Sequence, residues 1–137
     1  MPHQIVEYSS NLESQVDIAA MIRLLHETVA GIDAFPRAAL RTRVARRDQY
    51  CIADHHPDNA FVHVLLRIAS GRSPEVKKAA GDRIFRVLCD YLAPVQASTP
   101  LGISFEIQEI DPVFRWKKNN LPAWLEKRAA ATDTTES

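Results

Sequence analysis

With 137 residues, of which 46% are hydrophobic and 25% charged, the chain is long enough to bury a core, and we expect one globular domain. Its 17 Lys and Arg balance its 17 Asp and Glu, so it has no net charge that would attract nucleic acid or an anionic membrane. No apolar run reaches the roughly 20 residues that span a bilayer, and no secretory signal is recognisable, so we expect a cytoplasmic protein.

The first third of the chain predicts a strand followed by a helix. Residues 5–8 have strand character, and Ser10 with Glu13 has the spacing of a capping box that would start a helix. Gly31 would end this helix. Its buried stripe would consist of apolar residues with helical spacing: Ile18, Ile22, Leu25 and Val29.

A second strand is expected within residues 39–54, where side chains alternate in character. This alternation places Arg41 and Arg43 on one face of the strand and apolar or small residues, such as Val44, on the other.

The same order of elements recurs in the second half of the chain. Residues 60–68 predict a strand with one wholly apolar face, and Ser73 with Pro74 predicts the start of a helix that Pro94 would stop. Residues 101–110 predict a fourth strand. The buried stripe of the second helix would be Val76, Ala80, Ile84, Val87 and Tyr91.

Two consecutive β-α-β units predict an α/β (α+β) fold with one four-stranded sheet and both helices on one face. The other face would be uncovered, and we expect it to meet other copies of the chain. A short C-terminal segment carries Phe114, Trp116 and Trp124, which either dock onto their own subunit or form an interface. We expect a single domain over residues 1–128 and a disordered tail over 129–137.

Few residues suggest chemistry. Removal of Met1 would give Pro2 a free secondary amine, and burial near arginines would keep this amine neutral and basic. The basic run from Arg41 to Arg47 fits a solvated strand edge, a nucleic-acid patch or an anion pocket. Arg72 favours the pocket, because it precedes a helix N-terminus and guanidinium pairs with carboxylates.

Other reactive residue types lack a recognisable pattern. The five histidines have no HxH or HExxH spacing, so no metal site is expected. Cys51 and Cys89 lack CxxC spacing, and we assign no role to them.

Four stretches together carry a family resemblance: MPHQIVEYSSNL, FPRAALRTRV, FVHVLLRIASGRS and ISFEIQEIDPVFRWKKNN. They resemble the 5-carboxymethyl-2-hydroxymuconate delta-isomerases of the tautomerase superfamily, whose members use an amino-terminal proline. The resemblance covers roughly residues 2 to 125. It implies a homotrimer and a cofactor-free keto-enol isomerase in the breakdown of the aromatic compound homoprotocatechuate (4-hydroxyphenylacetate).

The resemblance also implies the site residues. Pro2 would be the general base and acid, while Arg41 and Arg72 would hold the carboxylates and the developing enolate. Arg43 would be a further substrate ligand or a structural ion-pair partner, and loop 46–59 would tune the pocket if it lines it. Two alternatives stay open: a non-catalytic trimeric homologue that binds carboxylates or a protein, and a tautomerase for another 2-hydroxy-dienoate.

Overall fold

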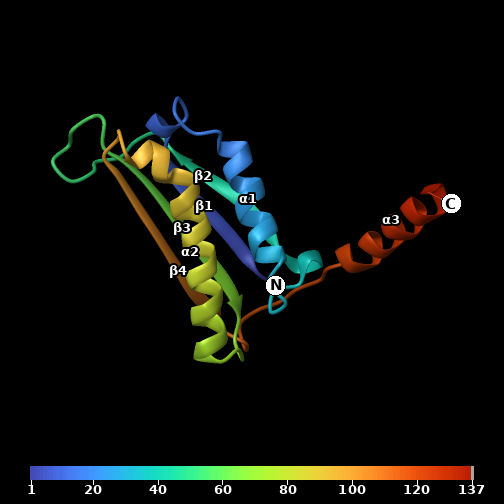
Figure 1. Ribbon diagram of the computed structural model, residues 1–137. Coiled ribbons are helices and arrows are strands. Elements are labelled where there is room, and N and C mark those ends of the chain that lie inside the picture. Colours follow the sequence, from blue (N-terminus) through green and yellow to red (C-terminus); the bar gives the residue numbers. More distant parts are fainter. Residues whose placement is uncertain (137) are drawn as a thin grey trace.

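The computed structural model describes residues 1–136, which form a four-stranded sheet with two long helices on one face (Figure 1). In chain order the elements are β1 (His3–Ser9), η1 (Ser10–Leu12), α1 (Ile18–Ala30), η2 (Arg37–Ala39), β2 (Arg41–Arg47), β3 (Ala60–Ala69), α2 (Pro74–Gln96), β4 (Leu101–Ile110) and α3 (Leu121–Glu136).

The sheet has the strand order β2-β1-β3-β4. Strands β1 and β2 are parallel, strands β3 and β4 are parallel, and the central pair β1 and β3 is antiparallel. The two predicted β-α-β units are therefore confirmed. Helices α1 and α2 lie side by side over the same face, whereas none of the described residues forms a layer over the opposite face, called the open face below (Figure 1).

The core fills the space between the sheet and the two helices. The predicted apolar face of β3 is buried from Ala60 to Ile68. The helix stripes are turned slightly from their predicted positions: Met21 and Leu25 are buried on α1, whereas Ile18 lies at its margin. Val76, in the first turn of α2, is exposed and lines a hollow together with residues 32–34, the segment that follows α1. The buried residues of α2 are Ala80, Ile84, Leu88 and Leu92.

The predicted capping box is wrong. Helix α1 starts only at Ile18, and the Asp17 side chain caps it by accepting a hydrogen bond from the Ala20 amide at 3.0 Å. The Glu13 carboxylate instead accepts hydrogen bonds from the Tyr8 hydroxyl at 2.8 Å and from Arg46 Nε at 2.5 Å. Tyr8 is five residues away, but Arg46 lies 33 residues further along the chain, so a local motif could not reveal this ion pair.

The limits of α2 agree with the prediction at one end only. Ser73 caps the N-terminus by accepting from the Val76 amide at 3.2 Å, as predicted. Pro94 does not stop the helix, which continues to Gln96. Because Pro94 lies in the last turn, it removes one hydrogen bond near an end where helical bonds are already running out.

The C-terminal segment leaves the sheet and ends in α3, which projects away from the other elements (Figure 1). Phe114 is 72% exposed and Trp116 is 86% exposed, so these two rings do not dock onto their own subunit. The structure also differs from the expected tail, because residues 129–136 continue α3. Three consecutive alanines, the residue with the highest helix propensity, lie in this part, while Ser137 lies outside the described residues.

Candidate active site

The site begins at the start of β1. The Pro2 carbonyl accepts a hydrogen bond from the Arg41 amide at 3.1 Å, so the first residues of β1 and β2 are tied together. Pro2 itself is buried. The sheet thus holds the N-terminus in a fixed place beside the predicted arginine of β2.

A cavity of about 470 Å³ opens at this edge of the sheet. Five of its lining residues carry a permanent positive charge, and none of its lining side chains within residues 1–136 is acidic. Such a lining attracts anions and offers donors to carboxylates. The lining residues are Met1, His3, Arg41, Arg67, Ile110, Phe114, Arg115, Trp116, Lys117 and Lys118.

The N-terminal amine belongs to Met1 in this structure and lies in the cavity wall. Burial is the main reason that its pKa is below the ordinary value of 8.0. Lys117, Arg115, Arg72 and Arg41 lower this pKa further by repelling the ammonium form. An amine at this position is therefore more readily neutral at physiological pH, and a neutral amine can accept a proton.

Arg41 and Arg43 lie on the same face of β2, as predicted, but they have different neighbours. Arg41 lines the cavity and donates from Nη1 to the Ala39 carbonyl at 3.1 Å. Arg43 lies outside the cavity lining, and its Nη1 is 3.1 Å from His3 Nδ1. Because guanidinium can only donate, this contact requires His3 Nδ1 to accept. The pKa of His3 is accordingly lowered from 6.5, first by burial and then by Arg43 and Arg41.

Arg72 is held at the turn between β3 and α2. Gly71 precedes it with φ of 111°, a conformation that favours glycine. The Arg72 guanidinium lies 5.1 Å from the centre of the Phe35 ring and donates to the carbonyls of Ala34 and Ala69. It affects the N-terminal amine electrostatically but does not line the cavity within a single chain.

Sequence reasoning missed several cations that the fold brings to this cavity. Arg67 arrives because β3 runs antiparallel to β1, which places it directly opposite His3. Arg115 and Lys117 line the cavity because the chain after β4 passes the start of β1. The pairing of β1 with β3, which brings Arg67 to the cavity, had no signal in the sequence.

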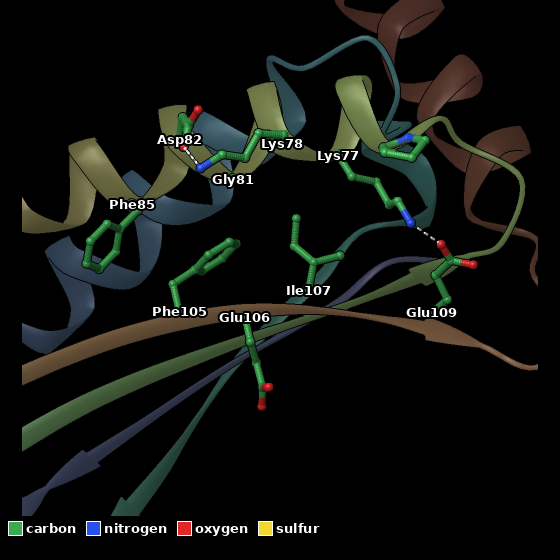
Figure 2. Close-up of a pocket in the computed structure, with 10 residues that line it drawn as sticks. Lys77, Lys78, Gly81, Asp82, Phe85, Phe105, Glu106, Ile107 and Glu109 are labelled. Atoms are coloured by element: carbon green, nitrogen blue, oxygen red, sulfur yellow. Dashed lines mark hydrogen bonds and ion pairs between the residues drawn. The ribbon is translucent and has the colours of Figure 1, made fainter.

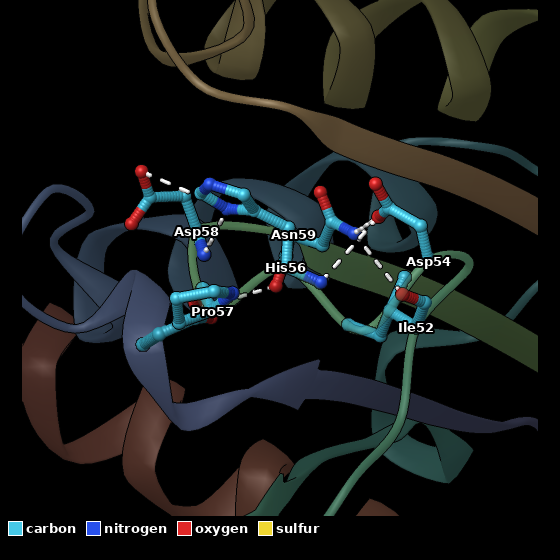
Figure 3. Close-up of polar contacts among 7 residues, drawn as sticks. Ile52, Asp54, His56, Pro57, Asp58 and Asn59 are labelled. Atoms are coloured by element: carbon cyan, nitrogen blue, oxygen red, sulfur yellow. Dashed lines mark hydrogen bonds and ion pairs between the residues drawn. The ribbon is translucent and has the colours of Figure 1, made fainter.

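The loop between β2 and β3 lies at the other end of the sheet. β2 runs parallel to β1, so its seven residues place the loop about 20 Å from Pro2. Asn59 Nδ2 donates to the carbonyl of Ile52 at 3.0 Å and to Asp54 Oδ1 at 2.8 Å (Figure 3). Asn11 fastens the loop to η1 by donating to the carbonyls of Pro57 and Asn59. Within its own chain, therefore, this loop does not line the cavity.

A second cavity, of about 460 Å³, lies between α2 and the edge strand β4 (Figure 2). Its floor is apolar, with Phe105 and Ile107 facing the helix. Its two lysines already have partners: Lys77 pairs with Glu109, and Lys78 lies 2.8 Å from Asp82. Because these cations are neutralised and none of the predicted residues lies here, we assign the chemistry to the N-terminal cavity.

Neither cavity contains a metal-binding cluster. Within residues 1–136, no group of three His, Cys, Asp or Glu side chains is placed to hold a metal ion. Both cysteines are free thiols, with Cys51 exposed and Cys89 partly buried. In the same residues, no helix combines the length and apolar character needed to cross a membrane.

Comparisons with known proteins identify the family of the chain. The family model for 5-carboxymethyl-2-hydroxymuconate isomerase matches residues 2–125. The 5-carboxymethyl-2-hydroxymuconate Delta-isomerase of Escherichia coli is 37% identical over 123 residues, which cover 90% of this chain and 98% of that protein.

Solved structures show the same relationship. The crystal structure of a 5-carboxymethyl-2-hydroxymuconate isomerase from Deinococcus radiodurans R1 is 40% identical and has a TM-score of 0.84, covering 90% of this chain and 93% of that chain. A fused 4-OT, described as a wild type symmetric trimer, shares the tautomerase fold at 16% identity and a TM-score of 0.59, covering 85% of this chain and 92% of that chain. The chain belongs to the 5-carboxymethyl-2-hydroxymuconate isomerase family, as its four sequence stretches indicated.

Proposed function

We propose that this protein is a cytoplasmic, cofactor-free isomerase of 5-carboxymethyl-2-hydroxymuconate in homoprotocatechuate breakdown, and that Pro2 supplies its base after removal of Met1. One observation carries the proposal: the N-terminal amine lies in a cavity whose lining has five permanent cations and no acidic side chain. The substrate has three carboxylates and becomes an enolate during the reaction. The cavity offers the charges that such a substrate requires.

The proposed reaction moves one proton along the conjugated chain. The neutral Pro2 amine accepts the proton of the 2-hydroxyl group, and the electron pair of the broken O–H bond forms the carbonyl at C2. The double bonds shift, and the ammonium form of Pro2 returns a proton to the far carbon. A positioned base of this kind contributes about a hundredfold to ten-thousandfold in rate.

The arginines have different parts in this proposal. Arg41 lines the cavity beside Pro2 and binds a substrate carboxylate. Arg72 keeps two of its five N–H groups free of its carbonyl partners and stabilises the developing enolate. Arg43 acts on substrate mainly through His3, whose neutral form it favours.

We further propose that the protein is a homotrimer. The open face of the sheet carries apolar side chains, among them Ile5 and Leu65, that are only partly buried in a single chain. Sheets with parallel pairs are usually covered on both faces. Most soluble oligomers consist of copies of one chain, so other copies of this chain are the expected cover. The symmetric trimer with the same fold supports this arrangement.

The proposal is tested by following the ultraviolet absorbance of 5-carboxymethyl-2-hydroxymuconate with protein whose intact mass shows that Met1 is absent. We expect consumption of the substrate without added metal or cofactor. A processed trimer that leaves this substrate and other 2-hydroxy-dienoates unchanged would contradict the enzymatic proposal. Binding of the substrate without turnover would instead favour a carboxylate-binding homologue.

A further inference from the structure

Arg67 differs from the other arginines of the sheet. The strands hold five arginines, and four of them use their guanidinium groups within the chain. Arg41 donates to a backbone carbonyl, Arg43 to His3, and Arg46 and Arg47 to glutamates. The Arg67 side chain has no hydrogen-bond or ion-pair partner among the side chains that the structure describes, those of residues 1–132. Within a single chain, all of its donors are therefore available to a ligand.

The place of Arg67 is fixed by the sheet. It lies on β3, where it is the register partner of His3 on one side and of Gln108 on the other. Its backbone is thus held between two neighbouring strands, whereas Arg115, Lys117 and Lys118 lie on the irregular segment after β4. A receptor on a regular element is positioned more accurately than one on a loop.

Arg67 and Arg41 lie on opposite sides of His3. His3 pairs with Arg41 on β2 and with Arg67 on β3, and all three line the same cavity. Neighbouring strands are about 4.8 Å apart, so the Cα atoms of the two arginines are separated by about 10 Å. Two guanidinium groups at this separation can bind two different carboxylates of one substrate.

We propose that Arg67 binds a second carboxylate of the substrate, distinct from the carboxylate at Arg41, and thereby makes the site selective for polycarboxylates. The inference rests on the proposed function, because it concerns the same cavity. Arg67 is then a specificity-determining residue. It strengthens the binding of substrates that carry an additional carboxylate and contributes little to the proton transfer at Pro2. Guanidinium binds a carboxylate through two parallel hydrogen bonds, which also fixes the direction in which the substrate lies.

The test compares three 2-hydroxy-dienoates with one, two and three carboxylates: 2-hydroxypenta-2,4-dienoate, 2-hydroxymuconate and 5-carboxymethyl-2-hydroxymuconate. We expect Arg67→Met to lower kcat/KM for at least one polycarboxylate by about tenfold to a hundredfold, mainly through KM, because one charged hydrogen-bonding pair is lost. For the monocarboxylate the loss should stay below about threefold, and Arg67→Lys should restore part of it. Arg86→Met removes the same charge from an exposed part of α2, on the face away from the cavity, and should leave all three rates unchanged.

Two results would overturn the inference. The first is an equal loss for all three substrates, because this would show a general effect on the site. The second is the absence of any loss with Arg67→Met. If the unmodified protein turns over none of the three compounds, the proposed function fails, and calorimetry with propane-1,2,3-tricarboxylate then decides the role of Arg67 separately. Unchanged affinity for this tricarboxylate in Arg67→Met would contradict the inference even without turnover.

Discussion

The two faces of the sheet use the same strands for different purposes. On β3, Val64 and Leu66 are fully buried beneath the helices, whereas their neighbours His63 and Arg67 belong to the open face. The covered face is mostly apolar and stabilises the fold mainly through burial. The open face carries charged side chains, some of which pair across strands, such as Arg47 with Glu7, and the candidate site lies at its edge. Because side chains of β3 alternate between the two faces, residues that stabilise the core and residues that belong to the face with the candidate site are neighbours on one strand.

The largest expected effect concerns the N-terminal end of the open face. If one residue is retained before Pro2, the proline nitrogen becomes a tertiary amide that cannot accept a proton near neutral pH. We expect turnover to fall by about a hundredfold to ten-thousandfold, the contribution of a positioned base. The measurement is the decay of substrate absorbance for processed and extended forms at equal concentration, with each N-terminus checked by mass.

The fold and carboxylate binding should survive this extension, because the ring, the strand and the arginines remain. Pro2→Ala with Met1 removed is the matched control, since alanine still presents an amine, though a primary and less rigid one. Its turnover should lie between those of the processed and extended forms. An extended form as fast as the processed one would exclude Pro2 as the base.

A pair of adjacent leucines separates the functions of the two faces. Leu66 is fully buried under the helices, so Leu66→Ala should lower the free energy of unfolding by about 2–5 kcal/mol through lost burial and a cavity. Leu65 lies on the open face and is only partly buried in one chain. We expect Leu65→Ala to weaken trimer assembly instead, as measured by sedimentation at micromolar concentration. A stable monomer of the unmodified chain would contradict the role given to the open face.

The arginines of β2 provide a comparison within one strand. Arg41 lines the cavity, so Arg41→Ala should lower kcat/KM by about tenfold or more, the loss of one charged hydrogen bond to substrate. Arg46 lies on the other side of the strand and pairs with Glu13 and Asp48. Arg46→Ala should therefore leave kcat/KM unchanged, and an equal loss in both variants would refute the site assignment.

The difference between the faces also explains what the sequence could reveal. Apolar alternation in residues 60–68 and 101–110 predicted β3 and β4, and Ser73 correctly marked the start of α2, because these signals depend on near neighbours. The place of Arg67 beside His3 and the pairing of Glu13 with Arg46 were not predicted, because they depend on how distant segments meet in the fold. Pro94 was misjudged for a different reason: its effect depends on where the helix ends, and it lies in the last turn of α2. The sequence therefore predicted the strands and the start of α2, but not the contacts between residues that are distant along the chain.

A polar exception on the covered face gives a smaller effect. Gln4 is fully buried, and its Nε2 donates to Thr42 Oγ1 at 3.1 Å. The same Thr42 oxygen lies 2.7 Å from His26 Nδ1. Gln4 Oε1 is buried without a hydrogen-bond partner. Thr42→Val would leave the Gln4 amide unpaired as well, at a cost of about 1–3 kcal/mol in the free energy of unfolding.

Two further variants test whether the loss in Thr42→Val comes from the unpaired Gln4 amide. Thr28→Val removes another buried hydroxyl, which donates to a carbonyl of its own helix, and should cost less because no buried donor is left unpaired. Replacing Gln4 by Met in the Thr42→Val background should recover part of the lost stability, because both polar partners are then absent. Denaturant unfolding of the unmodified protein and these three variants measures the differences.

The smallest expected effect is a pH dependence that comes from His3 on the open face. Burial and the nearby Arg43 and Arg41 lower the pKa of His3 below 6.5 in the folded state, so the unfolded state binds more protons below about that pH. Stability contributed by neutral His3 is present above pH 6.5 and is lost as the pH falls through the lowered folded-state pKa. His3→Gln keeps an acceptor for Arg43 but cannot titrate, so it should lose less stability than the unmodified protein between pH 7 and pH 5. His55→Asn, in the exposed loop 46–59, is the matched control and should follow the unmodified protein. Denaturant unfolding at both pH values makes the measurement. A His3→Gln curve that parallels the unmodified one would show that burial and the arginines do not lower the pKa of His3 in the folded protein.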